Sequence, residues 1–363
     1  MKIALFGNYN DHNFGDDLMA VMFGRFLQKC NIDFTVYNLC REYAEPYGFH
    51  VADSIKTLLS GKDMLIYGGG GSLCDDIKPS AQYQADRCCL LELAEQRALP
   101  VYGFSMGGSG RYPQPIFPFQ QLFLQAVRYI SVRNFQDVHW IKQMKPRIRV
   151  DCFPDIIWQT SAYFPRRRTE NKRPMIGVHL HATPLIRQRA VYVPLLFSAI
   201  TRLRRDADFI FLDITGKREN LIRLKKWFGE RSNVGYYQFH RLAEDLDVLS
   251  SLDLLCSTQL HTGVACMTYG IPFISVFGHT KTKILLENLQ LSSCYYDHHN
   301  MTALCSLLLS PRRLRHFLRD LKLPNIDLLQ RESLGHFEML EKCIMDRAKK
   351  DKNGIAERTV HEG

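Results

Sequence analysis

The chain lacks the features that mark a secreted, membrane-spanning or disordered protein. Charged residues make up only 23% of its 363 residues and hydrophobic residues 46%, which is the composition of a globular protein. No apolar run reaches the length that spans a bilayer. The opening residues MKIALFG lack the apolar core and the small-residue cleavage site of a signal peptide. We therefore expect a cytoplasmic protein, and its length suffices for two α/β domains.

Metal and nucleotide motifs are also missing. The 11 cysteines are scattered without ligand spacing, which favours reduced thiols and no disulfide. His298 and His299 stand beside Asp297 without a third or fourth ligand at a metal spacing, so we expect no zinc site there. The glycines at 68–71 have neither the Gly-Lys-Ser/Thr ending of a nucleoside-triphosphate loop nor the spacing of a dinucleotide site. The sequence thus predicts no bound metal, NAD or ATP.

Acidic residues are fewer than basic ones. The chain has 37 aspartates and glutamates against 47 lysines and arginines, a formal net charge of +10. This excess favours anionic partners, and basic runs lie at 166–168, 202–205 and 217–226. Because no aromatic-rich basic motif accompanies them, we expect no nucleic acid partner but peripheral contact with an anionic membrane surface. A face that is merely solvated is the alternative.

Strand and helix patterns alternate along the chain, as in a parallel sheet. We expect strands at 2–6, 34–39, 64–67, 101–104, 129–132, 175–180 and 209–214, and helices at 17–30, 82–98, 193–204 and 218–228. The pattern predicts an α/β fold of two Rossmann-like lobes that face a cleft, a glycosyltransferase-B-like architecture. The expected parts are an N-terminal lobe at 1–165, a linker at 166–174, a C-terminal lobe at 175–333, a terminal helix at 334–350 and a flexible tail at 351–363.

The most informative stretch lies at residues 254–276. Apolar residues 254–256 predict a strand that stops at small polar residues, and a helix-compatible segment with His261 in its first turn follows. A second apolar strand comes after the Gly-x-Pro turn at 270–272. In an open parallel sheet, ligands bind outside the carboxyl ends of the strands, where helix N-termini attract anions. His261 is therefore placed for chemistry on an acidic substrate.

Two glycine loops and a strand-end arginine also suit an anionic ligand. Gly15 and Asp16 lie between an expected strand and helix, and Gly69 and Gly70 let main-chain amides approach a ligand closely. Capping of the helix by the aspartate and a plain tight turn are the structural alternatives. Arg133, at the end of an expected strand, can grip phosphate or carboxylate through two parallel hydrogen bonds.

Residues 257–261, Ser-Thr-Gln-Leu-His, resemble the Ser-x-Arg-Leu-His element of the polysaccharide pyruvyltransferase family. Gln259 stands where the family usually has arginine. Further stretches resemble that family in the same order along the chain: the loop at 7–17 that ends in Asn-Phe-Gly-Asp-Asp, the glycine run at 68–71, the strand end at 130–134 and the loop at 277–281. Together the matches span residues 3 to about 289.

The resemblance implies a ketal-forming transferase of exopolysaccharide or cell-surface glycan biosynthesis. Phosphoenolpyruvate would give its pyruvyl group to two hydroxyls of a sugar or lipid-linked oligosaccharide, with no cofactor. His261 would deliver the proton to the donor's methylene carbon, since imidazole titrates near physiological pH. Arg133 and Lys281 would bind the anionic donor. Gln259 and Leu260, together with the two glycine loops, would complete the substrate site.

Gln259 and Asn134 depart from the family pattern and leave two alternatives open. A nucleotide-sugar glycosyltransferase would share the architecture, and fold alone does not separate the two chemistries. A non-catalytic binding member of a polysaccharide assembly system would tolerate the changes. Loss of a charge-assisted contact at residue 259 costs roughly 1.5–3 kcal/mol of donor binding. Arg187 and Arg189, which follow the first strand of the second lobe, are the residues that would compensate.

Overall fold

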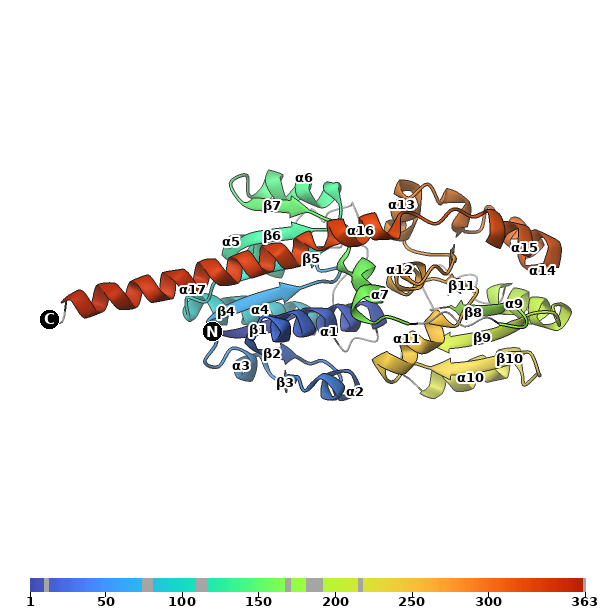
Figure 1. The fold of residues 1–363 in the computed structure, drawn as a ribbon, viewed down its shortest axis with the longest axis horizontal. Coiled ribbons are helices and arrows are strands. Elements are labelled where there is room, and N and C mark those ends of the chain that lie inside the picture. Colours follow the sequence, from blue (N-terminus) through green and yellow to red (C-terminus); the bar gives the residue numbers. More distant parts are fainter. Residues whose placement is uncertain are drawn as a thin grey trace. The chain divides into compact units, whose positions relative to one another are not determined.

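The computed structural model describes residues 1–9, 13–73, 81–108, 116–166, 171–180, 192–214 and 218–361 (Figure 1). The chain divides into two compact units, each built on its own parallel sheet. The first unit comprises Met1–Asn10, Asp16–Ile156 and Leu328–Gly363, and the second comprises Asp11–Gly15 and Ile157–Asp327. The two expected Rossmann-like units are therefore confirmed.

The first sheet has seven parallel strands in the order β3-β2-β1-β4-β5-β6-β7. Their bounds are β1 Lys2–Phe6, β2 Asp33–Tyr37, β3 His50–Ala52, β4 Met64–Gly68, β5 Val101–Met106, β6 Val127–Val132 and β7 Arg149–Cys152. Every residue of β4 is buried, because a central strand of a parallel sheet is covered on both faces. The strand order reverses between β1 and β4, and that reversal is where such sheets bind ligands.

The second sheet has six parallel strands in the order β10-β9-β8-β11-β12-β13. Their bounds are β8 Met175–His179, β9 Asp208–Asp213, β10 Val234–Gln238, β11 Leu254–Ser257, β12 Phe273–Val276 and β13 Tyr295–Tyr296. Here the order reverses between β8 and β11, whose residues pair in register from Ile176 with Leu254 to His179 with Ser257. The carboxyl ends of these two strands therefore form the ligand-binding edge that the topology predicts for this unit.

Helices connect the strands of both units. Those of the N-terminal half are α1 Phe14–Lys29, α2 Arg41–Ala44, α3 Ile55–Leu58, α4 Ala81–Gln96, α5 Pro118–Ala126, α6 Phe135–Met144 and α7 Thr160–Tyr163, with 3-10 turns η1 Glu45–Tyr47 and η2 Ile156–Gln159. The rest are α9 Tyr192–Leu203, α10 Arg218–Phe228, α11 Leu242–Ser250, α12 Leu260–Thr268, α13 Thr280–Asn288, α14 Met301–Leu309, α15 Pro311–Asp320, α16 Ile326–Ser333 and α17 Gly335–His361, with the 3-10 turn η3 Ser292–Cys294. Among the described residues, none of these helices has both the length and the apolar character to cross a bilayer.

The boundary between the units falls at Ile156, before the predicted linker at 166–174. Residues at the predicted start of that linker are held by the second unit: the Tyr269 hydroxyl donates to the Phe164 carbonyl oxygen over 2.8 Å, and Arg166, the first residue of the predicted linker, pairs with Asp247. A basic, proline-bracketed composition indicated the linker, but side-chain contacts of these residues place them in the second unit. The predicted N-terminal lobe therefore ends about nine residues too late.

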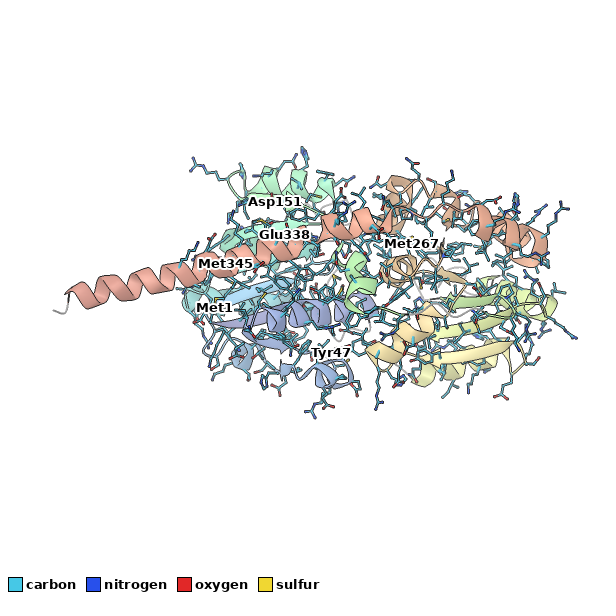
Figure 2. All side chains as sticks on the ribbon, viewed as in Figure 1. Met1, Tyr47, Asp151, Met267, Glu338 and Met345 are labelled. Atoms are coloured by element: carbon cyan, nitrogen blue, oxygen red, sulfur yellow. The ribbon has the colours of Figure 1, made fainter. Side chains whose placement is uncertain are left out.

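The C-terminal helices also differ from the prediction. The chain returns from the second unit to the first at Leu328, and the ring of Phe337 on α17 stacks on Phe26 of α1 at a centroid distance of 4.6 Å. Figure 2 labels Glu338 and Met345 along α17. The helix continues to His361, beyond the end expected at residue 350, since no proline interrupts the sequence after that residue. The predicted tail is thus helical up to His361.

Candidate active site

His261 lies in the first turn of α12, directly after the carboxyl end of β11. The turn between them is closed by Ser257, whose Oγ accepts the Gln259 backbone N–H over 3.0 Å and lies 3.1 Å from His179 Nδ1 on β8. His261 itself is almost fully buried. The sequence-predicted histidine therefore stands at the point where the strand order reverses, within a packed environment that fixes its ring. Met267, labelled in Figure 2, marks the same helix.

Gly15 packs directly on His261 within the second unit. A β-carbon built on Gly15 would overlap the His261 side chain at Nδ1, Cβ and Cγ. The neighbouring Phe14 makes an edge contact with Phe239 at a ring-centroid distance of 5.2 Å. Residue 15 must therefore lack a side chain if the imidazole is to keep this position. The sequence-predicted glycine loop and histidine are thus neighbours in the fold.

Gln259 is the N-cap residue of α12, with an extended backbone at φ −97° and ψ 134°. Its amide oxygen accepts a hydrogen bond from the Thr262 hydroxyl over 3.4 Å, and neither Gln259 nor Leu260 is fully buried. The side chain thus remains at the helix N-terminus, where free N–H groups and the helix dipole favour an anion. Residue 259 is in the position that the motif predicts for a donor-binding group, but it brings no charge.

Lys281 lies in the first turn of α13 and is half-buried, whereas Lys283 is exposed with its Nζ 5.8 Å from the centre of the Tyr295 ring. A lysine in a first turn opposes the helix dipole, so helix stability does not explain Lys281. The loop before α13 is tight: Phe277 has a positive φ of 52°, and a β-carbon on Gly278 would overlap Ser275 Oγ. This geometry favours Lys281 over Lys283 as the lysine of the motif.

In the first unit, Gly69 and Gly70 lie at the carboxyl end of β4 with φ of 77° and 87°, which few other residues adopt. A β-carbon on Gly70 would lie 3.4 Å from Oδ1 of the buried Asp16, and one on Gly69 would lie 2.6 Å from Met19 Sδ. Nearby, the Tyr9 hydroxyl donates to the Gly68 carbonyl oxygen over 2.6 Å. The glycine run and the Asp16 loop are therefore brought together at the point where the first sheet reverses.

Arg87 on α4 is a buried cation at this edge that the sequence analysis missed. Its Nη2 donates to Asn8 Oδ1, its Nη1 donates to the Tyr83 carbonyl oxygen over 3.2 Å, and its guanidinium lies 3.2 Å from the centre of the Tyr83 ring. Among the described residues its Nε has no hydrogen-bond partner. Arg87 falls within a helix of weak amphipathic pattern, so its burial had no signal in the sequence.

Arg133 follows β6 as predicted, but its side chain is held inside the first unit. Its Nη1 donates to Asp155 Oδ2 over 2.5 Å, with side-chain exposures of 7% and 10% for the pair. A β-carbon on Gly107 would overlap the guanidinium. Asn134, the second departure from the family pattern, caps α6: its Oδ1 accepts the Asp137 N–H over 2.8 Å. A cap of this kind suits asparagine and aspartate alike.

His336 supports the strand that carries Arg133. It reaches from α17 to Ser131 on β6, with Nδ1 2.7 Å from the Ser131 Oγ, and its Nε2 lies 3.1 Å from the Pro154 carbonyl oxygen. Burial lowers the pKa of His336 to about 4, and the nearby Asp155 carboxylate opposes this shift only in part. His336 is therefore a neutral, structural histidine.

The structure groups most of the predicted site residues, one set in each unit. His261, Gln259 and Gly15 are gathered in the second unit, where Lys281 follows the neighbouring strand β12. Asp16, Gly69 and Gly70 are gathered in the first unit, which also holds Arg133. Arg187 and Arg189, the expected compensating cations, lie outside the described residues.

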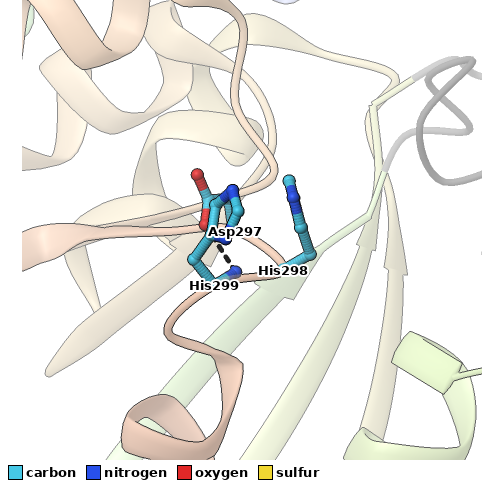
Figure 3. Close-up of side chains that lie close together, drawn as sticks. All are labelled: Asp297, His298 and His299. Atoms are coloured by element: carbon cyan, nitrogen blue, oxygen red, sulfur yellow. Dashed lines mark hydrogen bonds between the residues drawn. The ribbon is translucent and has the colours of Figure 1, made fainter.

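Three potential metal ligands meet at Asp297, His298 and His299, after the edge strand β13 (Figure 3). The ligand atoms of the three residues all lie within 4.8 Å of one another. Asp297, which the sequence analysis named only as a neighbour of the histidines, is therefore close enough to act as a third ligand. Both histidines are exposed, and Asp297 Oδ1 accepts the His299 backbone N–H over 2.8 Å. Within the described residues, the ten cysteines are free thiols.

Residues 13–280, most of the chain, match the family model of polysaccharide pyruvyl transferase. The chain belongs to the polysaccharide pyruvyl transferase family. The match includes every sequence-predicted site residue from Gly15 to His261 and ends one residue before Lys281. It follows that the acceptor of this family, a sugar or polysaccharide, is the relevant substrate class. No curated protein matches the chain.

Several solved structures with the same fold hold a nucleotide or a nucleotide sugar. MnaA of S. aureus bound to UDP has 13% sequence identity and a TM-score of 0.62, over 89% of this chain and 92% of that chain. UDP-GlcNAc 2-epimerase of Neisseria meningitidis bound to UDP-GlcNAc has 12% identity and a TM-score of 0.60, over 96% and 100%. HepE of Anabaena in complex with UDP has 9% identity and a TM-score of 0.56, over 96% and 100%. At such low identity the likeness shows the fold, two Rossmann-like units, and not the reaction.

Proposed function

We propose that this member of the family transfers the pyruvyl group of phosphoenolpyruvate to two hydroxyls of one sugar residue, forming a cyclic ketal and releasing phosphate. The observation that carries the proposal is His261, buried in the first turn of α12 and packed on Gly15, within a motif of the matched family. Two new C–O bonds form at the donor's C2 atom while its C–O bond to phosphate breaks. The two hydroxyl protons are balanced by protonation of the methylene carbon and of the departing phosphate.

In this proposal His261 delivers the proton to the methylene carbon. Protonation there makes C2 electrophilic, and a positioned acid of suitable pKa accelerates such a step by roughly two to four decades. The N-terminus of α12 offers free N–H groups to the donor's carboxylate or phosphate. The neutral Gln259 at this terminus would donate a further hydrogen bond to the donor. Lys281 and Arg133 are the cations assigned to the anionic donor in this proposal, because they stand at the motif positions of the family.

The acceptor is a sugar that presents two hydroxyls to one carbon, on a polymer or a lipid-linked oligosaccharide. No metal or organic cofactor enters the proposed chemistry, since the protons are moved by side chains and the phosphate is already a good leaving group. Nucleotide-sugar transfer is the second candidate, and the UDP and UDP-GlcNAc bound to proteins of the same fold favour testing it.

Ligand protection against heat separates the candidates, because a ligand stabilises the native state by mass action. Phosphoenolpyruvate should raise the unfolding temperature of the protein, and incubation with glycan acceptors should release phosphate and yield a ketal detectable by NMR. His261→Ala should lower the rate of phosphate release by roughly two to four decades, whereas His316→Ala, which alters an exposed histidine on α15, should leave it unchanged. Protection by UDP-sugars alone would establish the second candidate, and protection by neither, without turnover, would support a binding member.

A further inference from the structure

Helices α9 and α10 pack against each other, and α10 also packs on β9 and β10 of the second sheet. Phe197 and Ile200 of α9 and Leu224 and Phe228 of α10 belong to the core of the second unit. Because this inner stripe already satisfies the packing requirement of both helices, further apolar residues on their outer side do not serve the core.

The outer side of both helices nevertheless carries large apolar side chains. Leu195 and Leu203 of α9 are 61% and 70% exposed, and Ile222 and Trp227 of α10 are 58% and 45% exposed. Scattered single apolar residues on a surface need no explanation, but these four lie on two helices that pack against each other. A tryptophan in such a group is typical of side chains that rest at a membrane interface, with an apolar ring and a polar N–H.

Cations surround these apolar residues. The exposed basic residues on and directly after the two helices are Arg202, Arg205, Arg223, Lys225 and Lys226. Asp206, directly after α9, is paired with Arg204 at 2.6 Å, and Glu230, two residues after α10, is exposed. Arg204 also donates to the Leu308 carbonyl oxygen of α14, which ties the next helix pair to α9. Beyond it, α15 adds exposed arginines at 312, 313 and 315.

We propose that this surface, formed by Leu195, Leu203, Ile222 and Trp227 with the cations of α9 and α10, docks on an anionic lipid bilayer. The pattern is that of an interfacial surface, in which lysine and arginine attract lipid headgroups while apolar side chains enter the interface. The exposed lysines share α10 with Ile222 and Trp227, so this helix offers charge and apolar contact to an anionic lipid layer together. Docking on a bilayer through this surface does not depend on the proposed reaction or on the donor.

Vesicle co-sedimentation of the full chain tests the proposal. The protein should pellet with vesicles of phosphatidylcholine and phosphatidylglycerol but not with pure phosphatidylcholine. Binding should weaken as salt is raised, because exposed charges are screened over about 8 Å at physiological ionic strength. Lys225→Glu/Lys226→Glu should lower the partition coefficient by at least about thirtyfold, from the contribution of each basic residue near an anionic surface. Trp227→Ala should lower it roughly fivefold, including at high salt, where the apolar contribution remains.

Matched variants elsewhere on the chain keep the test specific. Lys56→Glu/Arg97→Glu changes the net charge by the same amount at exposed sites of the first unit and should leave vesicle binding unchanged. Circular dichroism and the unfolding temperature identify any variant that has lost its fold. Equal loss of binding in the control pair, equal binding to neutral vesicles, or no binding to anionic vesicles at low salt would overturn the proposal. Salt-sensitive self-association or nucleic acid binding through these residues, in place of vesicle binding, would do so as well.

Discussion

Gly15 lies against the imidazole of His261, so closely that residue 15 has no room for a β-carbon. This contact joins two sequence motifs that are far apart along the chain. It also gives the glycine a physical role: its missing side chain leaves space for the ring that we propose as the proton donor.

Gly15→Ala should therefore damage catalysis as well as folding. The added methyl group must displace the His261 ring, and a misplacement of about 1 Å costs roughly a hundredfold in rate. The kcat for phosphate release should fall by about that factor, and the unfolding temperature should fall as well, because the added methyl group also overlaps His261 Cβ. Gly48→Ala, at an open position with positive φ in the first unit, is the control and should affect stability alone. Wild-type kcat in Gly15→Ala would contradict the assignment of His261.

Gln259→Arg tests the departure from the family pattern. An arginine at the N-cap of α12 would add a charge-assisted contact to an anionic donor, worth about 1.5–3 kcal/mol. If the donor is phosphoenolpyruvate, its KM should fall by roughly tenfold or stay unchanged, while kcat is kept. Isothermal titration with phosphoenolpyruvate provides the independent measurement. Weaker phosphoenolpyruvate binding in this variant would argue against the family's donor in this chain.

Arg133→Ala should weaken donor binding and also destabilise the first unit. It would leave the Asp155 carboxylate buried without its partner, and breaking a buried ion pair costs about 3–5 kcal/mol. Urea unfolding measures the stability loss, and KM for the donor measures the binding loss. Arg133→Ala/Asp155→Asn removes the stranded charge and should recover much of the stability but not the KM. Recovery of both would show that Arg133 has a structural role only.

His336 should make stability depend on pH. Its pKa is lowered by burial from the ordinary 6.5 to about 4, so the unfolded chain binds a proton more readily than the folded one. The free energy of unfolding is therefore unaffected by His336 above pH 6.5, where this histidine is neutral in both states. It decreases as pH falls from 6.5 towards 4, by about 3 kcal/mol in all. Urea unfolding across this pH range should show a steeper decrease in the free energy of unfolding for the wild type than for His336→Gln. Parallel curves for the two proteins would refute the assignment.

Removal of divalent metal ions should leave turnover unchanged. The proposed proton and phosphate steps use side chains alone, and the cluster at 297–299 lies after the edge strand of the second sheet rather than where its strand order reverses. Dialysis against EDTA should keep kcat within twofold of the untreated protein. If activity is lost and zinc restores it, His298→Ala/His299→Ala shows whether this cluster holds the required ion.

Local sequence patterns determined the elements and the motifs. The bounds of β1 and α10 were predicted to the residue. In an apolar strand or an amphipathic helix, the spacing of the apolar residues along the sequence shows which positions are buried. The order of strand, turn and helix around His261 was also predicted, with β11 ending one residue later than expected. Edge elements such as β7 and β13 were missed, because short, half-exposed strands carry little apolar alternation.

Only the tertiary structure decided which distant residues meet. Ser131 and His336 are 205 positions apart, and the sequence around either residue does not indicate that the two form a hydrogen bond. The burial of Arg87 beside Asn8, the inward pairing of Arg133 with Asp155 and the packing of Gly15 on His261 are of the same kind. A periodic pattern specifies that a face is buried, whereas the partner is chosen by chain topology and by shape and charge at the contact.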